Sequence, residues 1–254
     1  MQDFAARVLM ERRPSLFFTG QAGFLFKNSD GYLLGVDLCL SDSVERVEGH
    51  MGFKRLLPKI LLPEELELDV LIATHAHADH FDRDAIPYLM AGRYTKLFAS
   101  ARCAEEVARI SLPEARCRYV GAGESVEVDG FSIVFVNCDH GEAAPDAVGV
   151  IIAFDGKRIH IAGDTCLRLD RTKALLAQGD FDVVIGPING AYGNMDEADF
   201  AAYAHALHAG MTIPCHYGMF AGHGGDPGRF YNIMREKYPE NRILLMAQGE
   251  CLVL

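Results

Sequence analysis

The chain has 254 residues, of which 50% are hydrophobic and 23% are charged, a composition typical of a globular protein. Its formal net charge of −11 argues against a nucleic-acid-binding surface, which needs clustered Lys and Arg, but permits a small anionic substrate held beside metal ions. Seven scattered cysteines, no secretory signal and no apolar run near the roughly 18–20 residues that cross a bilayer predict a cytoplasmic protein with no membrane partner.

The first half of the chain predicts a short helix, three strands and then an alternation of strands and helices. An amphipathic pattern over 4–12 predicts the first helix, and 28–31 predicts a turn because its glycine tolerates positive φ. Residues 41–66 have little periodicity and predict a long loop with one or two helical turns. The expected strands cover 16–19, 23–26, 32–37, 70–74, 96–99 and 117–120, and the expected later helices cover 82–91 and 101–110. Pro87 predicts that the helix over 82–91 is short or bent.

The second half predicts two hairpins followed by strands that alternate with helices. The first hairpin spans 125–136 around an Asp-Gly turn, and the second joins 148–154 to 158–162. Further strands are expected over 182–186, 211–214, 243–246 and 251–254, with helices over 170–178, 196–209 and 227–237. Two β-rich halves interleaved with surface helices predict an α/β protein with two stacked sheets and helices outside. This is a four-layer αββα sandwich, formed by a single domain over 1–254.

A cluster of metal-binding residue types follows the predicted strand 70–74. Residues 74–80 read Thr-His-Ala-His-Ala-Asp-His, and three imidazoles with one carboxylate would be costly in a core without partners. His75 and His77 are two residues apart, so on an extended chain their side chains point the same way and can hold one metal ion. Asp79 and His80 follow where the chain turns toward the next helix, which directs them at a neighbouring point. The spacing therefore predicts two adjacent metal sites at the C-terminal end of a strand.

Three more candidate ligands, His140, Asp164 and His216, each follow an apolar strand. A single His or Asp at a strand end is more often a capping or loop residue than a ligand. The shared position of these three after strands, and their order behind the first cluster, argue against coincidence. Cysteines within two residues of these ligands are better explained as small buried residues than as ligands; they are Cys138, Cys166 and Cys215.

With this order of motifs, HxHxDH and then His, Asp and His, the chain resembles the metallo-β-lactamase-fold hydrolases over nearly its whole length. It is most similar to the L-ascorbate-6-phosphate lactonase-like group, on the segments 71–75, 182–187 and 213–216. The resemblance implies two divalent metal ions, zinc or manganese, and assembly into a homo-oligomer. It assigns His75, His77 and His140 to the first ion, Asp79, His80 and His216 to the second, and Asp164 to both.

Two cations that share a water molecule lower its pKa toward neutrality and so supply hydroxide without a strong protein base. That hydroxide can attack an ester or lactone, while one metal stabilises the developing oxyanion and Asp79 orients the nucleophile. The resemblance makes the lactone of a small anionic sugar acid, such as L-ascorbate 6-phosphate, the expected substrate. A metal-dependent phosphodiesterase and a non-catalytic metal-binding protein stay open as alternatives, although a degenerate member should have lost ligands. Lys54, Arg55 and Arg229 are either phosphate contacts or ordinary surface charges.

Two glycine-containing loops are candidate walls of a substrate site. In the loop 189–194, Tyr192 either donates a hydrogen bond to substrate or packs as a structural residue. In the loop 220–227, which follows His216, His223 is either a catalytic proton donor or an exposed loop residue. The remaining histidines show no ligand pattern and are interpreted as structural or solvated; they are His50, His160, His205 and His208.

Overall fold

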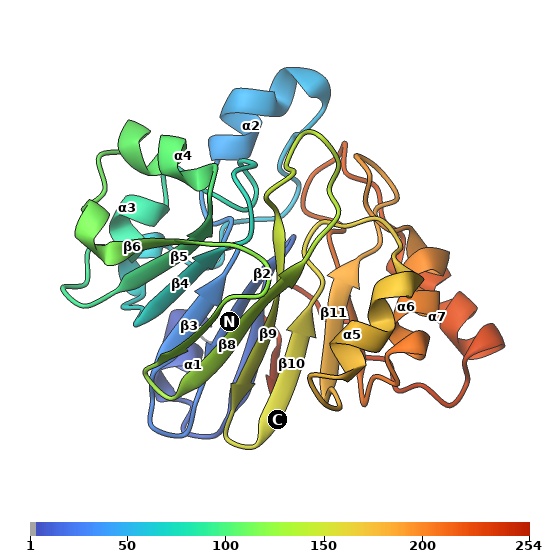
Figure 1. Cartoon of the computed structure of the whole chain (residues 1–254). Helices are drawn as coiled ribbons and strands as arrows, with labels where there is room; N and C mark the ends of the chain where they lie inside the picture. Colours follow the sequence, from blue (N-terminus) through green and yellow to red (C-terminus); the bar gives the residue numbers. More distant parts are fainter. Residues whose placement is uncertain (1–3) are drawn as a thin grey trace.

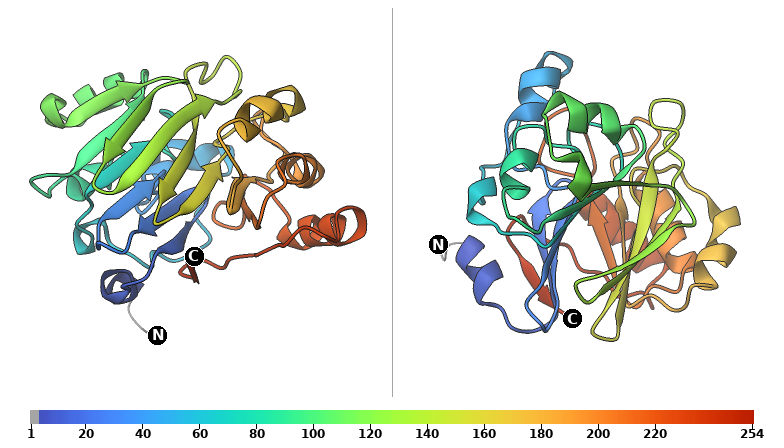
Figure 2. Two further views of the ribbon diagram at one scale, coloured as in Figure 1. Left: turned by 60° about the horizontal axis from the view of Figure 1, so that its bottom comes forward. Right: turned by 60° about the vertical axis from the view of Figure 1, so that its left-hand side comes forward.

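The computed structural model describes residues 4–254, in which two β-sheets lie face to face between two layers of helices (Figures 1 and 2). The seven-stranded sheet has the order β13-β1-β2-β3-β4-β5-β6, and the six-stranded sheet has the order β12-β11-β10-β9-β8-β7. The predicted four-layer αββα sandwich is therefore confirmed.

The helices and strands have the following bounds. The first sheet contains β1 (Ser15–Gly20), β2 (Gly23–Lys27), β3 (Leu33–Val36), β4 (Val70–Ala73), β5 (Lys96–Ser100), β6 (Cys117–Val120) and β13 (Cys251–Val253). The second contains β7 (Ser125–Val128), β8 (Phe131–Asn137), β9 (Val148–Phe154), β10 (Lys157–Ile161), β11 (Val183–Pro187) and β12 (Thr212–Cys215). The α-helices are α1 (Phe4–Met10), α2 (Ser43–Glu48), α3 (Ile86–Leu89), α4 (Cys103–Arg109), α5 (Thr172–Leu176), α6 (Glu197–Ala206) and α7 (Pro227–Lys237). Short 3₁₀ helices are η1 (Gly49–Met51), η2 (Pro63–Glu65), η3 (Glu114–Arg116) and η4 (Leu169–Arg171).

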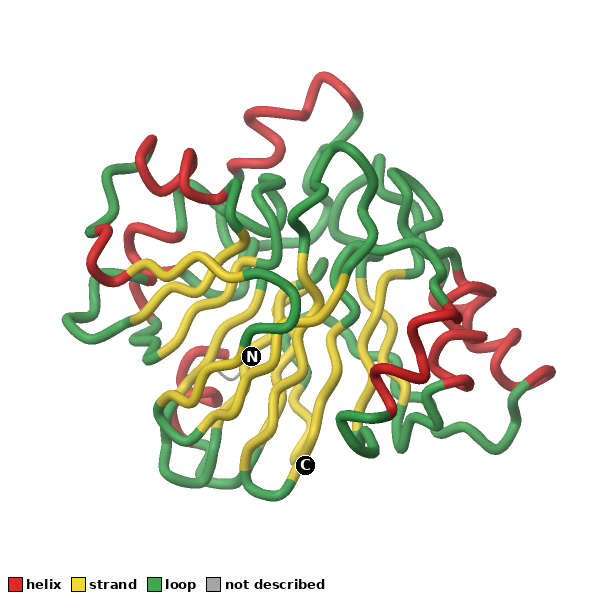
Figure 3. Tube along the Cα trace, viewed as in Figure 1, coloured by secondary structure: helices red, strands yellow, loops and turns green. Residues whose placement is uncertain are grey.

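Strand direction brings the loops of interest to one edge of the sandwich. β3 to β6 run parallel to one another, and so do β10, β11 and β12. β8 is antiparallel to β9, which is antiparallel to β10, so β8 also ends where β10 and β12 end. The longer loops gather at this edge (Figure 3), whereas the hairpin turns at 129–130 and 155–156 lie at the opposite edge. Parallel strands thus deliver side chains from distant parts of the chain to a common place.

Three apolar layers hold the sandwich together. Between the sheets, the buried core includes Phe24, Phe26, Phe131 and Ile152. A second layer packs the first sheet against α1, α3 and α4, and a third packs the second sheet against α5, α6 and α7. Because both faces of each sheet are covered, the central parallel strands β3, β4 and β11 are apolar and buried at every position.

Two expected elements differ from the structure by more than a few residues at their ends. Residues 243–246 form no strand: Ile243 makes one isolated bridge to Thr212, and the N–H of Leu244 donates to the carbonyl of Thr212 at 3.0 Å. The chain then leaves the second sheet and crosses to the first, where β13 pairs with β1. Too few residues remain beside β12 to continue a ladder, so the prediction of a strand over 243–246 was wrong.

The helix expected over 82–91 shortens to α3. The carboxylate of Asp82 accepts hydrogen bonds from the N–H groups of Asp84 and Ala85 at 3.1 and 3.2 Å, which forms a turn before the helix begins. Pro87 then lies in the first helical turn, as the prediction of a short helix required. Among residues 4–254, no helix combines the length and the hydrophobicity needed to cross a bilayer.

Candidate metal centre

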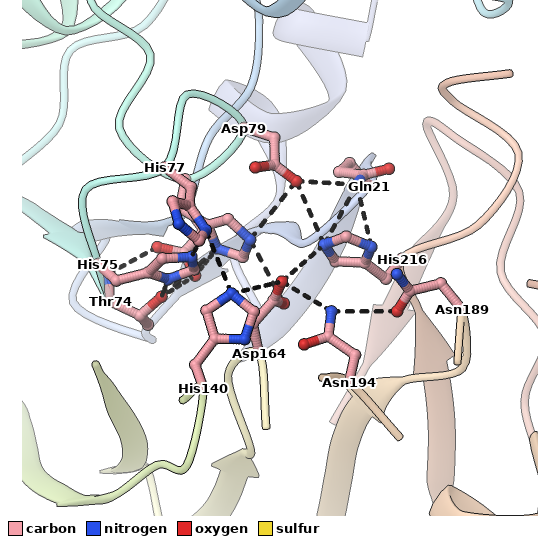
Figure 4. Close-up of polar contacts among 12 residues, drawn as sticks. Gln21, Thr74, His75, His77, Asp79, His140, Asp164, Asn189, Asn194 and His216 are labelled. Atoms are coloured by element: carbon pink, nitrogen blue, oxygen red, sulfur yellow. Dashed lines mark hydrogen bonds and ion pairs between the residues drawn. The ribbon is translucent and has the colours of Figure 1, made fainter. Parts of the chain in front are cut away.

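The residues of the HxHxDH motif lie just beyond the end of β4, at the edge between the two sheets (Figure 4). The chain turns tightly there, because the N–H groups of Phe81 and His80 both donate to the carbonyl of His77, at 2.7 and 3.0 Å. This turn, rather than a helix start, brings Asp79 and His80 back toward the first two histidines. The turn therefore brings the four side chains of the motif together in one cluster.

The first group of side chains consists of three imidazoles. Nε2 of His75 lies 2.9 Å from Nδ1 of His77, and that Nδ1 lies 3.2 Å from Nε2 of His140. His140 comes from the loop after β8, on the other sheet. Their ligand atoms all lie within 4.8 Å of one another, which is the spacing of three ligands around one cation.

The second group combines a carboxylate and two imidazoles. Nε2 of His216 lies 3.2 Å from Oδ2 of Asp79, and Nε2 of His80 lies 3.5 Å from the same oxygen. The ligand atoms of these three residues also lie within 4.8 Å of one another. His216 follows β12 and has a φ of 65°, a left-handed conformation that a side chain adopts only at a cost.

Asp164 lies between the two groups (Figure 4). Its Oδ1 is 3.4 Å from Nε2 of His80, and its Oδ2 is 3.1 Å from Nε2 of His216 and 3.9 Å from Nε2 of His140. Asp164 follows β10 and is 5% exposed. The structure thus brings together all seven predicted ligands, with one carboxylate facing both groups.

The donor set of the cluster fits divalent metal ions. Nδ1 of His80 lies 2.8 Å from Oδ2 of Asp37, so that nitrogen carries a hydrogen and Nε2 faces the cluster. Nε2 of His80 is buried and has no hydrogen-bond partner among the described residues. Imidazole nitrogens and carboxylate oxygens in this arrangement suit zinc, manganese and other divalent cations. A metal would provide the partner that the buried nitrogen lacks.

Burial keeps the first group neutral. It lowers the pKa of His75 well below the usual value of 6.5, and the nearby His80 lowers it further. Burial also lowers the pKa of His77 and that of His140. Neutral imidazoles are the form that binds metal, so these three residues need lose no proton near neutral pH.

In the second group the imidazoles and the carboxylates favour opposite charges. Burial opposes the charged form of His80, but Asp164, Asp79 and Asp37 overcome it and raise its pKa well above 6.5. Burial likewise disfavours the charged form of His216, but Asp164 and Asp79 outweigh this effect and raise the pKa of His216 to about 9. Burial favours the neutral form of Asp79 and of Asp164. The histidines that face them outweigh this effect and lower the pKa of both carboxyl groups well below 3.8. Metal binding to this group must therefore displace protons.

Asp37 supports the cluster from behind and was not predicted as a site residue. Besides its contact with His80, its two carboxylate oxygens accept from the N–H and the hydroxyl of Thr74 at 2.8 and 2.7 Å. The residue is 1% exposed. Its position directly after the apolar run 32–36 is the same signal that identified the other ligands, so the sequence did contain a hint.

A pair of asparagines holds Asp164 from the other side. Nδ2 of Asn194 donates to Oδ2 of Asp164 at 2.8 Å and to Oδ1 of Asn189 at 3.1 Å. Both asparagines belong to the loop that was predicted to line the site. Their contact with Asp164 was not predicted, because it joins residues that lie 30 positions apart.

Gln21 is the third residue that sequence reasoning missed. It lies in the turn between β1 and β2, is fully buried, and its Nε2 donates to Oδ2 of Asp79 at 2.9 Å. The same nitrogen contacts Nδ1 of His223 and both ring nitrogens of His216. No spacing or residue type marks this glutamine in the sequence.

His223 and Tyr192 occupy an aromatic wall beside the cluster. His223 is 5% exposed, and its ring centroid lies 4.6 Å from that of Phe53 and 4.8 Å from that of His216. Burial lowers the pKa of His223 to about 4, so its ring is neutral at pH 7. Tyr192 is exposed and lies edge-on to Phe53 at 5.7 Å. His223 is therefore a buried neighbour of the candidate ligands and not an exposed loop residue.

The candidate phosphate contacts have intramolecular partners. Lys54 pairs with Glu45 at 2.5 Å, and Arg229 lies 3.7 Å from Glu197. Arg55 donates to main-chain carbonyls of its own and the preceding loop, those of Leu57, Ser41 and Cys39. These contacts favour a structural role for the three basic side chains over a role in binding phosphate.

The remaining candidates behave as ordinary residues of the fold. His160 is buried against Tyr203, His205 is half-buried beside Asn241, and His50 and His208 are exposed. The thiol of Cys138 donates to the carbonyl of Asp164 at 2.9 Å, and Cys215 is buried. Among the described residues, none of the ligand groups contains a cysteine.

A two-sheet sandwich that gathers five histidines and two aspartates at one edge is the arrangement of a metallo-β-lactamase fold. Residues 37–217 match the family model described as the beta-lactamase superfamily domain, and the chain belongs to that superfamily. It is a metal-dependent hydrolase of this class, as its cluster and its relatives together indicate.

Curated relatives extend over most of the chain. A UPF0173 metal-dependent hydrolase of Thermococcus onnurineus is 28% identical over 198 residues, which cover 76% of this chain and 84% of that protein. Another, from Pyrococcus abyssi, is 26% identical over 245 residues, covering 93% and 98%.

Solved structures share the fold. The metallo hydrolase Igni18 of Ignicoccus hospitalis superimposes with a TM-score of 0.71 at 23% identity, covering 94% of this chain and 97% of that one. An isothiocyanate hydrolase from Delia radicum gut bacteria superimposes with a TM-score of 0.75 at 21% identity, covering 94% and 99%.

Proposed function

We propose that this hydrolase holds two divalent ions, zinc or manganese, and opens the lactone or ester of a small anionic sugar acid such as L-ascorbate 6-phosphate. The observation that carries the dinuclear part is the position of Asp164, whose carboxylate lies 3.1 Å from His216 and 3.9 Å from His140, facing both ligand groups. In this proposal His75, His77 and His140 hold one ion, Asp79, His80 and His216 hold the other, and Asp164 contacts both.

The bound ions would supply Lewis acidity and a nucleophile at neutral pH. Asp79, held by Gln21, would orient that nucleophile in addition to binding metal. His223 is neutral near pH 7, and in that form it can donate a hydrogen bond to the substrate oxygen on which charge develops. Phe53 and Tyr192 would shield this side of the substrate from water.

The substrate part of the proposal rests on the lactonase-like sequence motifs. The candidate phosphate contacts Lys54, Arg55 and Arg229 each have a partner within the protein. Whether the enzyme needs a phosphate on its substrate is therefore tested by comparing substrates with and without one. A cytoplasmic location, the absence of nucleic-acid and membrane partners, and assembly into a homo-oligomer remain predictions. The last can be checked by light scattering during gel filtration.

The experiment starts from metal-free protein reconstituted separately with manganese and with zinc under reducing conditions. Metal content per chain is measured by mass spectrometry, and opening of L-ascorbate 6-phosphate is followed by loss of its ultraviolet absorbance. An unphosphorylated lactone and bis-p-nitrophenyl phosphate serve as competing substrates. We expect two ions per chain and metal-dependent loss of the lactone signal.

The matched variants are His77→Ala, in the cluster, and His208→Ala, on the surface. His77→Ala should keep the circular dichroism of the folded protein but lose metal and turnover, while His208→Ala should retain both. Full activity and full metal content in His77→Ala would refute the site. Hydrolysis of the phosphodiester alone would instead identify a phosphodiesterase, and bound metal with no turnover of any substrate would remove the lactonase assignment.

A further inference from the structure

Gln21 has a backbone conformation that makes its presence informative. It is the first of two residues between β1 and β2, and its φ is 56°. This left-handed region is unfavourable for a residue with a side chain, and glycine is the residue that such a turn favours. Strain of this kind persists where the surrounding structure uses the residue. The side chain of Gln21 should therefore have a task.

Hydrogen bonding determines how the carboxamide of Gln21 is oriented. Nε2 lies 2.9 Å from Oδ2 of Asp79, a carboxylate that can only accept, so the NH₂ end of the amide must face it. In this orientation Oε1 is buried and has no hydrogen-bond partner within residues 4–254. Leaving a buried acceptor unpaired is unfavourable, so the contacts of the NH₂ group outweigh that cost.

The NH₂ group has two hydrogens, and its nitrogen lies within hydrogen-bond distance of Asp79, of His223 and of both ring nitrogens of His216. One hydrogen is directed to Asp79, and the other is available to Nδ1 of His223, which Nε2 of Gln21 contacts. A nitrogen that accepts this bond carries no hydrogen of its own, so in the neutral ring the hydrogen resides on Nε2. The ring is held in place by Phe53 at 4.6 Å and by Phe220 at 5.4 Å, measured between centroids.

We propose that Gln21 is a positioning residue that couples Asp79 to His223 and holds His223 in its Nε2–H tautomer, so that His223 donates a hydrogen bond to the substrate oxygen that gains negative charge. No proton is transferred in this step; the imidazole stays neutral throughout. The proposal rests on the hydrolase function proposed above, but it makes a statement about the tautomer of one ring that can be measured without any substrate.

The spectroscopic test uses protein labelled with ¹⁵N-histidine and loaded with zinc, which is diamagnetic. Long-range ¹H–¹⁵N spectra report which ring nitrogen of each histidine carries the hydrogen, and the His223→Asn variant assigns the signals of His223. We expect Nδ1 of His223 to be unprotonated in the natural protein and to become protonated, at least in part, in Gln21→Leu. A hydrogen on Nδ1 in the natural protein would overturn the proposal, whatever the substrate proves to be.

The kinetic test compares Gln21→Leu, which has similar volume and no donor, with Gln21→Glu, which has the same shape and cannot donate. Each should lower kcat by about 10–100-fold with a smaller change in KM, while two metal ions per chain remain bound. The matched control is Gln248→Leu, because Nε2 of Gln248 donates to the carbonyl of Thr19 at 3.0 Å, beside the same hairpin but outside the cluster. That variant should keep the natural kcat.

A double-mutant cycle separates action through His223 from action through the metal ligand Asp79. If Gln21 acts through His223, Gln21→Leu should have little further effect on kcat in a His223→Asn background. Full additivity of the two substitutions would overturn the coupling, as would kcat values within twofold of the natural protein in both Gln21 variants. Failure of the proposed hydrolase function has a different signature, namely absent metal or absent turnover in the natural protein.

Discussion

The main-chain N–H of His216 donates to the carbonyl oxygen of Gln21 at 2.7 Å, and both residues have left-handed φ values, 65° and 56°. The bond joins the tip of the β1–β2 hairpin in the first sheet to the end of β12 in the second. Each of the two conformations costs about 1 kcal/mol for a residue with a side chain. The two strained positions therefore support each other at the place where the sheets meet beside the His/Asp cluster.

The first prediction concerns Asp37, which supports His80 from behind. Replacement by Asn should lower the affinity for zinc about 10–100-fold, because the carboxylate that fixes the tautomer and orientation of the His80 ring is lost. Affinity is measured by competition with a chromophoric chelator. Asp69→Asn is the control: Asp69 also accepts a main-chain N–H, that of Leu33 at 2.8 Å, but lies outside the cluster. Equal affinities in the two variants would contradict the role of Asp37.

The second prediction concerns acid stability and a histidine away from the cluster. Burial lowers the pKa of His160 from 6.5 to about 4, and its Nε2 lies 2.9 Å from the hydroxyl of Tyr203. Between these two pKa values the unfolded chain binds the proton more readily than the folded protein does. The contribution of neutral, buried His160 to the free energy of unfolding is therefore complete above pH 6.5 and falls as the pH drops toward 4. The loss amounts to about 3 kcal/mol.

The measurement for His160 is the free energy of unfolding of the metal-free protein in urea at pH 7 and pH 4. Groups common to the natural protein and His160→Gln cancel in the difference between them. On going from pH 7 to pH 4, the natural protein should lose about 3 kcal/mol of unfolding free energy relative to His160→Gln. A difference independent of pH would show that His160 does not titrate with a depressed pKa.

The third prediction concerns Asp82, which anchors the loop before α2 to the loop of the metal ligands. Its buried carboxylate accepts from the N–H groups of Leu40 and Ser41 at 2.9 and 2.7 Å and from the hydroxyl of Ser43 at 2.9 Å. Asp82→Ala leaves these donors unpaired and should lower the free energy of unfolding by roughly 2–4 kcal/mol.

Urea denaturation measures the effect of Asp82→Ala, and the neighbouring Asp84→Ala provides the control. Asp84 pairs with Arg46 at the surface, where the side chains are 38% and 61% exposed, so its loss should cost less than about 1 kcal/mol. Similar costs for the two variants would mean that the anchoring contacts of Asp82 contribute little.

The fourth prediction concerns Gly149 in the middle of the second sheet. A Cβ at this position would lie 2.8 Å from the carbonyl oxygen of Ala162 and 3.0 Å from that of Ile161, main-chain atoms just before Asp164. Gly149→Ala should therefore destabilise the protein by about 1–3 kcal/mol and disturb the position of Asp164. In Gly121→Ala the new Cβ meets nothing closer than 3.8 Å, so its thermal midpoint should stay unchanged. Two equal midpoints would argue against the close approach at Gly149.

Local patterns explain which parts of the site could be predicted. His75, His77 and His80 lie within one short segment, and their spacing relative to β4 determines where they point. His140 and Asp164 were recognised because each follows an apolar strand, and parallel strands end at one edge. The fold followed from the same alternation of strands and helices, and both sheets form as expected.

Partners that are distant in sequence account for what could not be predicted. Gln21 meets Asp79 across 58 positions and His216 across 195, and no local pattern encodes either contact. The strand expected over 243–246 failed for a related reason. Its apolar residues suit a strand, but the chain must leave β12 there to reach β1 in the other sheet, and only the tertiary structure reveals that requirement.

The separation of the hairpin turns from the metal edge has a practical consequence for handling the protein. The turn at 155–156 connects β9 to β10 at the end of the sandwich away from the cluster, and a Cβ at Gly156 would meet nothing within 4 Å. Exposed tips of this kind tolerate inserted peptides. An attachment tag placed there would tether the molecule to a support with its metal edge facing the solution, so that immobilised protein would keep its reactive face open.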